Sequence, residues 1–150
     1  MSRACFIVVL FLAVWSRAFA AEPNPIVTLK VGEHEILSEV AATPKAARVG
    51  LAFRAGLPDD GAMLFRYSGK TPRCLWMKDT LIPLTVAFLE ADGRIINLID
   101  MKPNTTNMHC AWRANWALEM NSGWFARRGV KRGDYIEGLS AAEALTGDKH

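Results

Sequence analysis

Ionisable side chains lie inside two strongly apolar segments of this 150-residue chain. Lys78 and Asp79 lie within residues 75–84, and Glu119 lies within residues 116–120. A buried charge is costly unless it meets an opposite charge and hydrogen-bonding partners. The pattern therefore allows two interpretations: a Lys78–Glu119 ion pair that satisfies the core, or a polar site that both residues line.

The second interpretation predicts a small-ligand site. Such sites combine apolar walls with a few converging polar groups. Arg54 and Lys78 would anchor an anionic or hydroxylated ligand, and two tryptophans would form the walls. The candidate residues are Arg54, Trp76, Lys78, Asp79, Thr80, Glu119, Asn121 and Trp124.

Two other kinds of site are alternatives. Asp79 and Glu119 could act as the acid/base pair of a hydrolase, because carboxylates in different environments have separated pKa values. The run Met108-His109-Cys110 offers soft ligands for copper, with further methionines elsewhere at Met63, Met77, Met101 and Met120. No standard catalytic signature is present, and the residues predict neither a cofactor nor a resident metal.

Charge excludes one class of partner. The full chain has 18 Lys and Arg against 15 Asp and Glu, a formal charge of +3. Without Arg3 and Arg17, which belong to the secretory signal described next, 16 basic residues face 15 acidic ones and the charge is +1. Because nucleic-acid binding needs a basic excess on one face, nucleic acid is not a predicted partner.

Residues 1–20 have the three-part form of a secretory signal. Arg3 supplies the positive start, residues 5–15 are an eleven-residue apolar run, and Ala18-Phe19-Ala20 offers small residues for cleavage. This run is too short to span a membrane, and no later stretch is long enough. We expect cleavage after Ala20 and a periplasmic or extracellular mature protein without a membrane span.

Export changes the interpretation of the cysteines. Removal of residues 1–20 leaves Cys74 and Cys110, an even pair in an oxidising compartment. The sequence thus predicts a Cys74–Cys110 disulfide. The alternative is two unrelated thiols, with Cys74 buried as a small apolar residue beside Leu75 and Trp76.

The remaining pattern predicts a β-rich α+β domain, with a mainly antiparallel sheet or a small open barrel and two short helices. Thr43-Pro44 is typical of a helix start and Gly50 of its end. A helical turn is expected at residues 124–128, a polar loop at 102–113, and a weakly helical, ancillary segment at 140–145. Strands are expected at residues 26–31, 34–40, 62–67, 73–78, 84–90, 95–99, 116–120 and 135–136.

Several blocks in order resemble one known family. They are residues 48–54, 61–65, 76–84 and 117–125, followed by Gly133-Asp134. Together they resemble the family catalogued as domain of unknown function 192, over residues 26–136. The resemblance implies a small β-rich fold with short helices and, commonly, export, but no activity.

Three positions depart from the pattern of that family. Asp79 stands where its members usually carry asparagine, Thr85 where they have aspartate, and Ala46 where they favour an acidic residue. If the family's aspartate at the position of Thr85 were catalytic, the activity of this chain would be impaired or would depend on Asp79 instead. The expected organisation is a signal at residues 1–20, a leader at 21–25, one domain at 26–138 and a C-terminal tail at 139–150.

Overall fold

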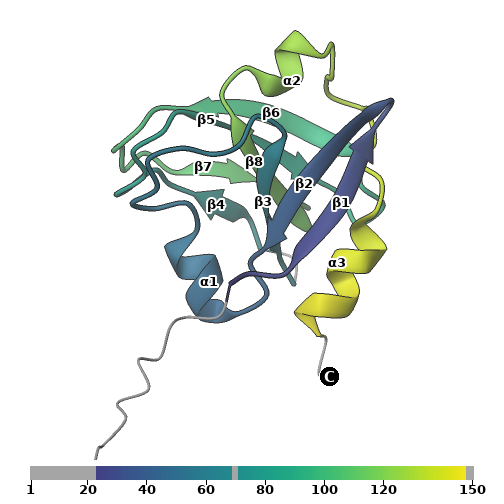
Figure 1. The fold of residues 1–150 in the computed structure, drawn as a ribbon, viewed down its shortest axis with the longest axis horizontal. Helices are drawn as coiled ribbons and strands as arrows, with labels where there is room; N and C mark the ends of the chain where they lie inside the picture. Colours follow the sequence, from purple (N-terminus) through teal and green to yellow (C-terminus); the bar gives the residue numbers. More distant parts are fainter. Residues whose placement is uncertain (1–22, 69–70, 148–150) are drawn as a thin grey trace, which may run out of the picture.

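The computed structural model describes residues 23–68 and 71–147, so the predicted signal at residues 1–20 lies outside the described residues. A six-stranded mixed sheet forms the body of the protein (Figure 1). Its strands, in spatial order, are β1 (Ile26–Val31), β2 (His34–Val40), β3 (Gly61–Arg66), β8 (Trp116–Asn121), β5 (Leu84–Leu89) and β6 (Ile95–Met101).

The sheet is open, because β1 and β6 are its two edges and it does not close into a barrel. β2 and β3 run parallel, while every other neighbouring pair in the sheet is antiparallel. The single compact, β-rich domain predicted from the sequence is therefore confirmed. β8 lies at the centre of the sheet, between β3 and β5.

Alternation of apolar and polar residues explains the first hairpin. In β1 every second residue is buried, and Leu29 pairs with Ile36 across the hairpin. The turn uses Gly32 at a φ of 57°, a conformation that glycine adopts without steric cost. β5 differs, since all six of its residues are buried.

Three short helices accompany the sheet in the described residues, one more than predicted. α1 (Pro44–Val49) begins where expected, because the Thr43 hydroxyl accepts a 3.1 Å hydrogen bond from the Ala46 amide. α2 (Trp124–Arg127) is the expected helical turn. α3 (Leu139–Thr146) buries Leu139 and Ala142, so this segment is part of the core and not ancillary.

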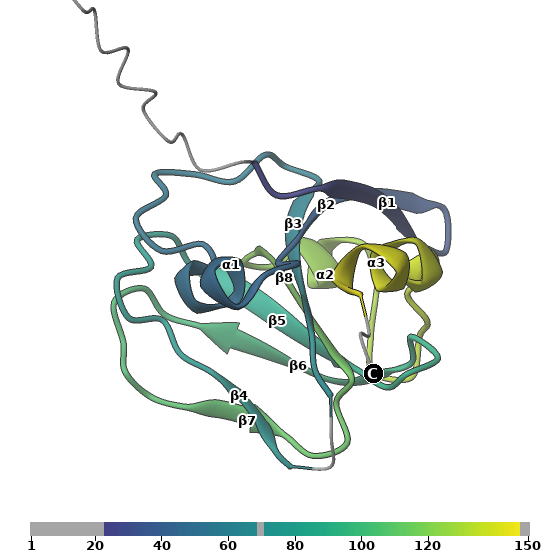
Figure 2. The same cartoon turned by 90° about the horizontal axis from the view of Figure 1, so that it is seen from below.

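A two-stranded ribbon of β4 (Arg73–Leu75) and β7 (His109–Ala111) lies on one side of the main sheet, opposite α3 (Figure 2). The sequence predicted a longer strand at residues 73–78 and only a loop at 102–113. Cys74 pairs with Cys110 in register, and the predicted disulfide joins them with a Cα–Cα distance of 4.0 Å. The strand predicted at residues 135–136 is reduced to isolated bridges.

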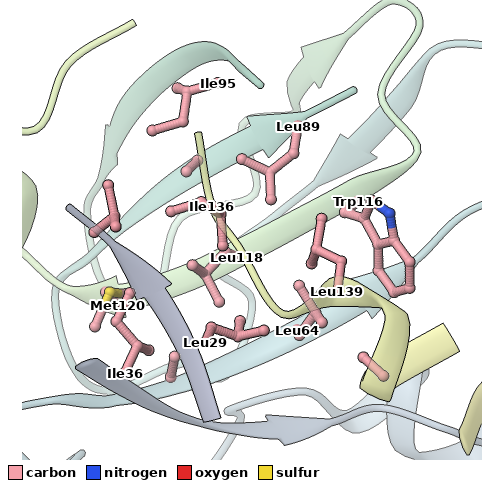
Figure 3. Close-up of a cluster of buried hydrophobic side chains, with 14 of the residues drawn as sticks. Leu29, Ile36, Leu64, Leu89, Ile95, Trp116, Leu118, Met120, Ile136 and Leu139 are labelled. Carbon is pink, nitrogen blue, oxygen red and sulfur yellow. The ribbon is translucent and has the colours of Figure 1, made fainter. Parts of the chain in front are cut away.

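The two faces of the sheet bury different clusters. The first core lies between the sheet and α3 (Figure 3), and its larger members include Leu29, Ile36, Leu64, Leu89, Ile95, Trp116, Leu118, Met120, Ile136 and Leu139. The second core lies on the face that the ribbon covers, and includes Leu51, Met63, Phe65, Met77, Leu84, Val86, Phe88, Met101 and Ala111. Among the described residues no helix has the length and hydropathy needed to cross a membrane.

Candidate functional site

The eight residues predicted to share a pocket are distributed over separate parts of the molecule. Arg54 lies beside α1, whereas Trp76, Lys78, Asp79 and Thr80 form a turn after β4. Glu119, Asn121 and Trp124 belong to the β8–α2 region. The structure therefore does not bring the set together as one tryptophan-walled site.

The turn after β4 is organised mainly by its backbone. Lys78 and Asp79 are exposed, and the Lys78 ammonium lies 5.7 Å from the centroid of the half-exposed Trp76 ring. The Asp79 carbonyl accepts a 2.8 Å hydrogen bond from the Phe53 amide, and the Thr80 carbonyl accepts one of 3.0 Å from the Asn104 amide. Two other loops are thereby tied to this turn.

Backbone conformation also accounts for the first departure from the family pattern. Asp79 has a φ of 58°, in the left-handed region that Asn and Asp adopt more readily than most other residues. Replacement of asparagine by aspartate therefore preserves the turn. Phe53 and Asn104, the partners named above, also have positive φ values, of 63° and 55°.

Glu119 lies in the centre of the sheet and not beside Lys78. Its register partners are Met63 on β3 and Val86 on β5, and only 5% of its surface is exposed. Burial raises the pKa of this carboxyl to about 8, and among the described residues no cation offsets this effect. The predicted Lys78–Glu119 ion pair is wrong. Asp79 is exposed in the turn after β4, and burial alone, without a contribution from Asp79, raises the pKa of Glu119.

Asn121 and Trp124 have structural roles. The Asn121 amide nitrogen donates to the carbonyls of Leu57 and Pro58, at 3.1 and 2.9 Å. Trp124 is fully buried, and its indole nitrogen donates to the Asp60 carboxylate at 2.9 Å. Both residues thus hold the loop before β3, and Trp124 has no free face for a ligand.

Thr85, the second departure, joins two backbone segments. Its hydroxyl donates to the Asp100 carboxylate at 2.5 Å and accepts a 3.2 Å hydrogen bond from the Gly123 amide. Asp100, on the neighbouring strand, thereby supplies a carboxylate close to the position where the family usually has aspartate. This arrangement ties β5 and β6 to the start of α2.

A cleft of about 740 Å³ lies beside α1, and Arg54 is the one predicted site residue that lines it. The cleft is bounded by the segment before β1, the end of β2 and α1 with the residues that follow it. Most of its wall is apolar, with Asn24, Glu39 and Arg54 forming a polar group. The lining comprises Pro23, Asn24, Pro25, Ile26, Glu39, Ala42, Thr43, Lys45, Ala46, Val49, Gly50, Ala52 and Arg54.

The polar group is an ion pair held by three hydrogen bonds. The Arg54 guanidinium binds Glu39 through both nitrogens, with Nη1 on Oε1 and Nη2 at 2.7 Å from Oε2. The Asn24 amide nitrogen donates to the same Oε2 at 3.0 Å. The hydrogen bond from Arg54 lowers the pKa of Glu39, and Glu39 in turn raises the pKa of Arg54. The pair therefore stays ionised and has no net charge.

Sequence reasoning missed Glu39 and Asn24, and also three polar groups inside the protein. The Tyr67 hydroxyl, the Arg73 Nε and the Asn97 Oδ1 are buried without a hydrogen-bond partner among the described residues. Tyr67 and Arg73 stood at the ends of predicted strands and Asn97 inside one. An isolated polar residue in an apolar strand was the only available signal.

The copper alternative loses its thiolate ligand, because Cys110 is bonded to Cys74. Met63, Met77 and Met101 are buried in the second core and Met120 in the first. Within residues 23–68 and 71–147 no group of three or more His, Cys, Asp or Glu side chains could hold a metal ion.

The solved structures that are similar to this chain include the following two proteins. A Sinorhizobium meliloti 1021 protein, whose name suggests a role in transcription regulation, has a TM-score of 0.76 and 28% identity, covering 80% of this chain and 98% of its own. A protein of unknown function from Novosphingobium aromaticivorans DSM 12444 has a TM-score of 0.72 and 32% identity, covering 79% of this chain and 94% of its own.

No curated protein matches the chain. The family of uncharacterised proteins named DUF192, described as "Uncharacterized ACR", matches residues 27–138. That match includes β1 to β8 and α2 almost completely, in agreement with the resemblance found in the sequence blocks. The chain therefore belongs to the DUF192 family.

Proposed function

We propose that this protein is an exported small-ligand-binding module whose site is the cleft beside α1. The observation that carries the proposal is an apolar cavity with an internally neutralised Arg54–Glu39 pair in its wall. The ligand has a neutral polar end with hydroxyl groups, joined to an apolar portion. The Cys74–Cys110 disulfide supports the export part of the proposal, because such bonds persist in oxidising compartments.

The volume of the cleft suits a small molecule. Its value of about 740 Å³ falls in the range of roughly 300–1,000 Å³ that ligand pockets occupy. The exposed side chains of Ile26 and Val49 lie on its wall, and water contact with them is unfavourable. A ligand with an apolar portion would remove this surface from water.

The Arg54–Glu39 pair favours a hydroxylated ligand over an anion at its part of the cleft, and Lys45, the other cation of the lining, is exposed to water. Glu39 already neutralises Arg54, so an anion would compete with an internal carboxylate for the same guanidinium. Hydroxyl groups can instead donate to Glu39 and accept from Arg54 or Asn24 without breaking the pair. Of the two ligand classes predicted from the sequence, anionic and hydroxylated, we therefore propose the hydroxylated class.

The first test uses two amphipathic probes of equal chain length on the mature protein. Octyl glucoside below its micellar concentration carries a neutral hydroxylated end, whereas octanoate carries an anion. We expect octyl glucoside to shift the amide resonances of Ile26, Ala46 and Val49 saturably, and octanoate to bind more weakly. Stronger binding of octanoate would overturn the assigned ligand class.

A matched pair of variants locates the site. Ala46→Trp places a large side chain into the cleft and should abolish binding of octyl glucoside. Ala47→Trp puts the same side chain on the neighbouring exposed position of α1, which does not line the cleft, and should leave binding unchanged. Equal binding by both variants, or no binding by the wild type, would refute the proposal.

A further inference from the structure

Three loops gather at the end of the sheet where β6 and β8 stop and β5 begins, on the left in Figure 1 and Figure 2. They are residues 51–54 after α1, residues 76–83 after β4 and residues 102–108 after β6. The amides of Phe53 and Asn104 each donate to a carbonyl of the middle loop, at 2.8 and 3.0 Å. These contacts join the three loops into one surface, which we call the loop end.

Each loop of the loop end exposes large apolar side chains to water. The exposed fraction is 72% for Phe53, 49% for Trp76, 51% for Leu81 and 58% for Met108. Trp76 follows β4 and Met108 precedes β7, so both lie where the ribbon meets the loops. Water contact with such side chains is unfavourable, and their gathering at one place is typical of an interaction surface.

The backbone holds this surface in a costly conformation. Phe53 has a φ of 63°, in the left-handed region that a bulky residue rarely adopts. Asp79 and Asn104 share this feature, so each loop contains one of the four non-glycine residues with positive φ in the described parts of the chain. Strained residues of this kind persist only where the surroundings fix them, and they concentrate at functional sites. The loop end therefore presents Phe53 in a fixed position before any partner arrives.

Cations accompany the apolar side chains. The Lys78 ammonium lies 5.7 Å from the centroid of the Trp76 ring, and Lys102 is exposed at the start of the third loop. In the second and third loops these two lysines face one carboxylate, Asp79. In the first loop Arg54 is neutralised by its ion pair inside the protein. The loop end thus combines apolar side chains with an excess of positive charge.

We propose that the loop end docks on the surface of a lipid bilayer that contains anionic headgroups. Tryptophan has an apolar body and a polar N–H group, which suits it to the level of the headgroups. The ammonium groups of Lys78 and Lys102 would meet lipid phosphates, while Phe53 and Leu81 would enter the boundary with the acyl chains. Docking does not require a ligand in the cleft beside α1, because Phe53 is not part of the cleft lining.

A second copy of the chain fits this surface less well than a bilayer. In a twofold contact the same patch meets itself, so Lys78 and Lys102 would approach equal charges on the other copy. An anionic bilayer supplies the opposite charge instead. It also needs no complementary groove, which agrees with loops that extend beyond the ends of the strands (Figure 2).

The experiment is flotation of the oxidised protein with lipid vesicles. Residues 1–20 are omitted, because their apolar run would bind lipid by itself. One set of vesicles contains phosphatidylcholine and phosphatidylglycerol in equal parts, and the other contains phosphatidylcholine alone. We expect the protein to float with the anionic set and to bind the neutral set at least about tenfold more weakly. No flotation with the anionic set, or equal binding to both, would overturn the proposal.

Two variants of the apolar side chains locate the contact. Phe53→Asn removes the ring but suits the left-handed backbone, and Trp76→Ser removes a half-exposed ring, so thermal melts should show that both fold. Each should weaken binding to the anionic vesicles at least about tenfold. Trp112→Ser is the matched control, because Trp112 is 69% exposed at the opposite end of the ribbon, and it should bind like the wild type. Equal weakening by the control would refute the location.

Charge variants test the lipid headgroup. Lys78→Gln and Lys102→Gln should each weaken binding to the anionic vesicles about fivefold. Arg94→Gln removes an exposed cation from the β5–β6 hairpin, at the other end of the sheet, and should leave binding unchanged. Sedimentation without lipid examines the other occupant: a dimer that Phe53→Asn dissociates would assign the loop end to a second copy and overturn the proposal.

Discussion

The two faces of the main sheet are covered by different elements and bury different kinds of side chain. On the first face, Leu29, Ile36, Leu64 and Leu118 have no exposed surface and pack under α3 (Figure 3). On the second face, the cover is a ribbon of two three-residue strands, and Glu119 lies among the apolar side chains. Both cores are closed to solvent, but the buried polar residues of the first face, Ser38 and Thr85, are uncharged, whereas the second face buries the ionisable Glu119.

Composition follows the same division. Met63, Met77 and Met101 belong to the second core, whereas Met120 is the one methionine among the buried members of the first. Methionine has three rotatable bonds and a polarisable sulfur, so it fills irregular space that branched residues cannot. The comparison teaches that the two faces of a small sheet can bury side chains of different flexibility and charge within one fold.

The largest effect should come from the first core. Leu118→Ala removes a fully buried side chain at the centre of the sheet and should lower the free energy of unfolding by about 2–5 kcal/mol. Leu84→Ala removes the same side chain from the other face, beside the flexible Met101, and should cost less because that neighbour can fill part of the space. Urea denaturation of both variants measures the contrast, and equal losses would contradict the division between the faces.

The ribbon provides the next largest effect. The disulfide joins residues 36 positions apart, and replacing both cysteines by alanine should lower stability by about 3–4 kcal/mol in the chain-entropy model. Amide exchange should accelerate most in β4 and β7, because strands this short are marginal without a cross-link. Uniform acceleration across both faces would show that the ribbon is not a separate unit.

The raised pKa of Glu119 should make the free energy of unfolding depend on pH. Its pKa rises from 4.5 to about 8 on folding, so the native state holds a proton that the unfolded chain has lost between these values. Stability should therefore fall as the pH rises through this window, by about 1.4 kcal/mol per pH unit at most, and level off above about pH 8. Tyr67, the titratable neighbour, stays protonated throughout because its own pKa is raised, and Arg73 stays charged.

Thermal melts between pH 5 and 9 measure this dependence. Glu119→Gln has no proton to lose and should abolish the decline, while the exposed Glu33→Gln should keep it. A wild-type curve that rises with pH in this window would mean that Glu119 is charged in the native state.

The smallest effect concerns α1, which borders the cleft and has no buried residue. Thr43→Ala removes the N-cap hydrogen bond to the Ala46 amide and should cost about 1 kcal/mol. Octyl glucoside binding should weaken because the helix frays at the wall of the cleft. Thr106→Ala, at an exposed loop position, is the control and should change neither property.

Local patterns were sufficient to predict most of the fold. Alternation in residues 26–40 gave the first hairpin, and Thr43-Pro44 with Gly50 gave the bounds of α1. The strand β7 could not be found in this way, because three residues have no readable period and their pairing depends on a distant β4. The C-terminal helix looked ancillary because its contact with β1 and β2 is a long-range property.

The candidate sites were less predictable because they depend on long-range geometry. The unusual position of Glu119 was visible in the sequence, but the side of the sheet on which it lies and the absence of Lys78 from that side were not. Lys78 follows Met77, which is fully buried, and only the turn at Asp79 decides that Lys78 faces solvent. The approach of Arg73 to Tyr67 and of Arg54 to Glu39 has no local signal at all.

The position of β8 has a consequence for the order of folding. This strand is the last of the main sheet in the chain, yet it separates β3 from β5. Until residues 116–121 pair, no strand joins the β1–β2–β3 part of the sheet to the β5–β6 part. Joining the two parts closes long loops, which has an entropic cost. Such non-local pairing slows folding to the millisecond-to-second range. Burial of Glu119 and completion of the sheet are thus expected in the same late step, so the folding rate should report on the protonation of one carboxyl.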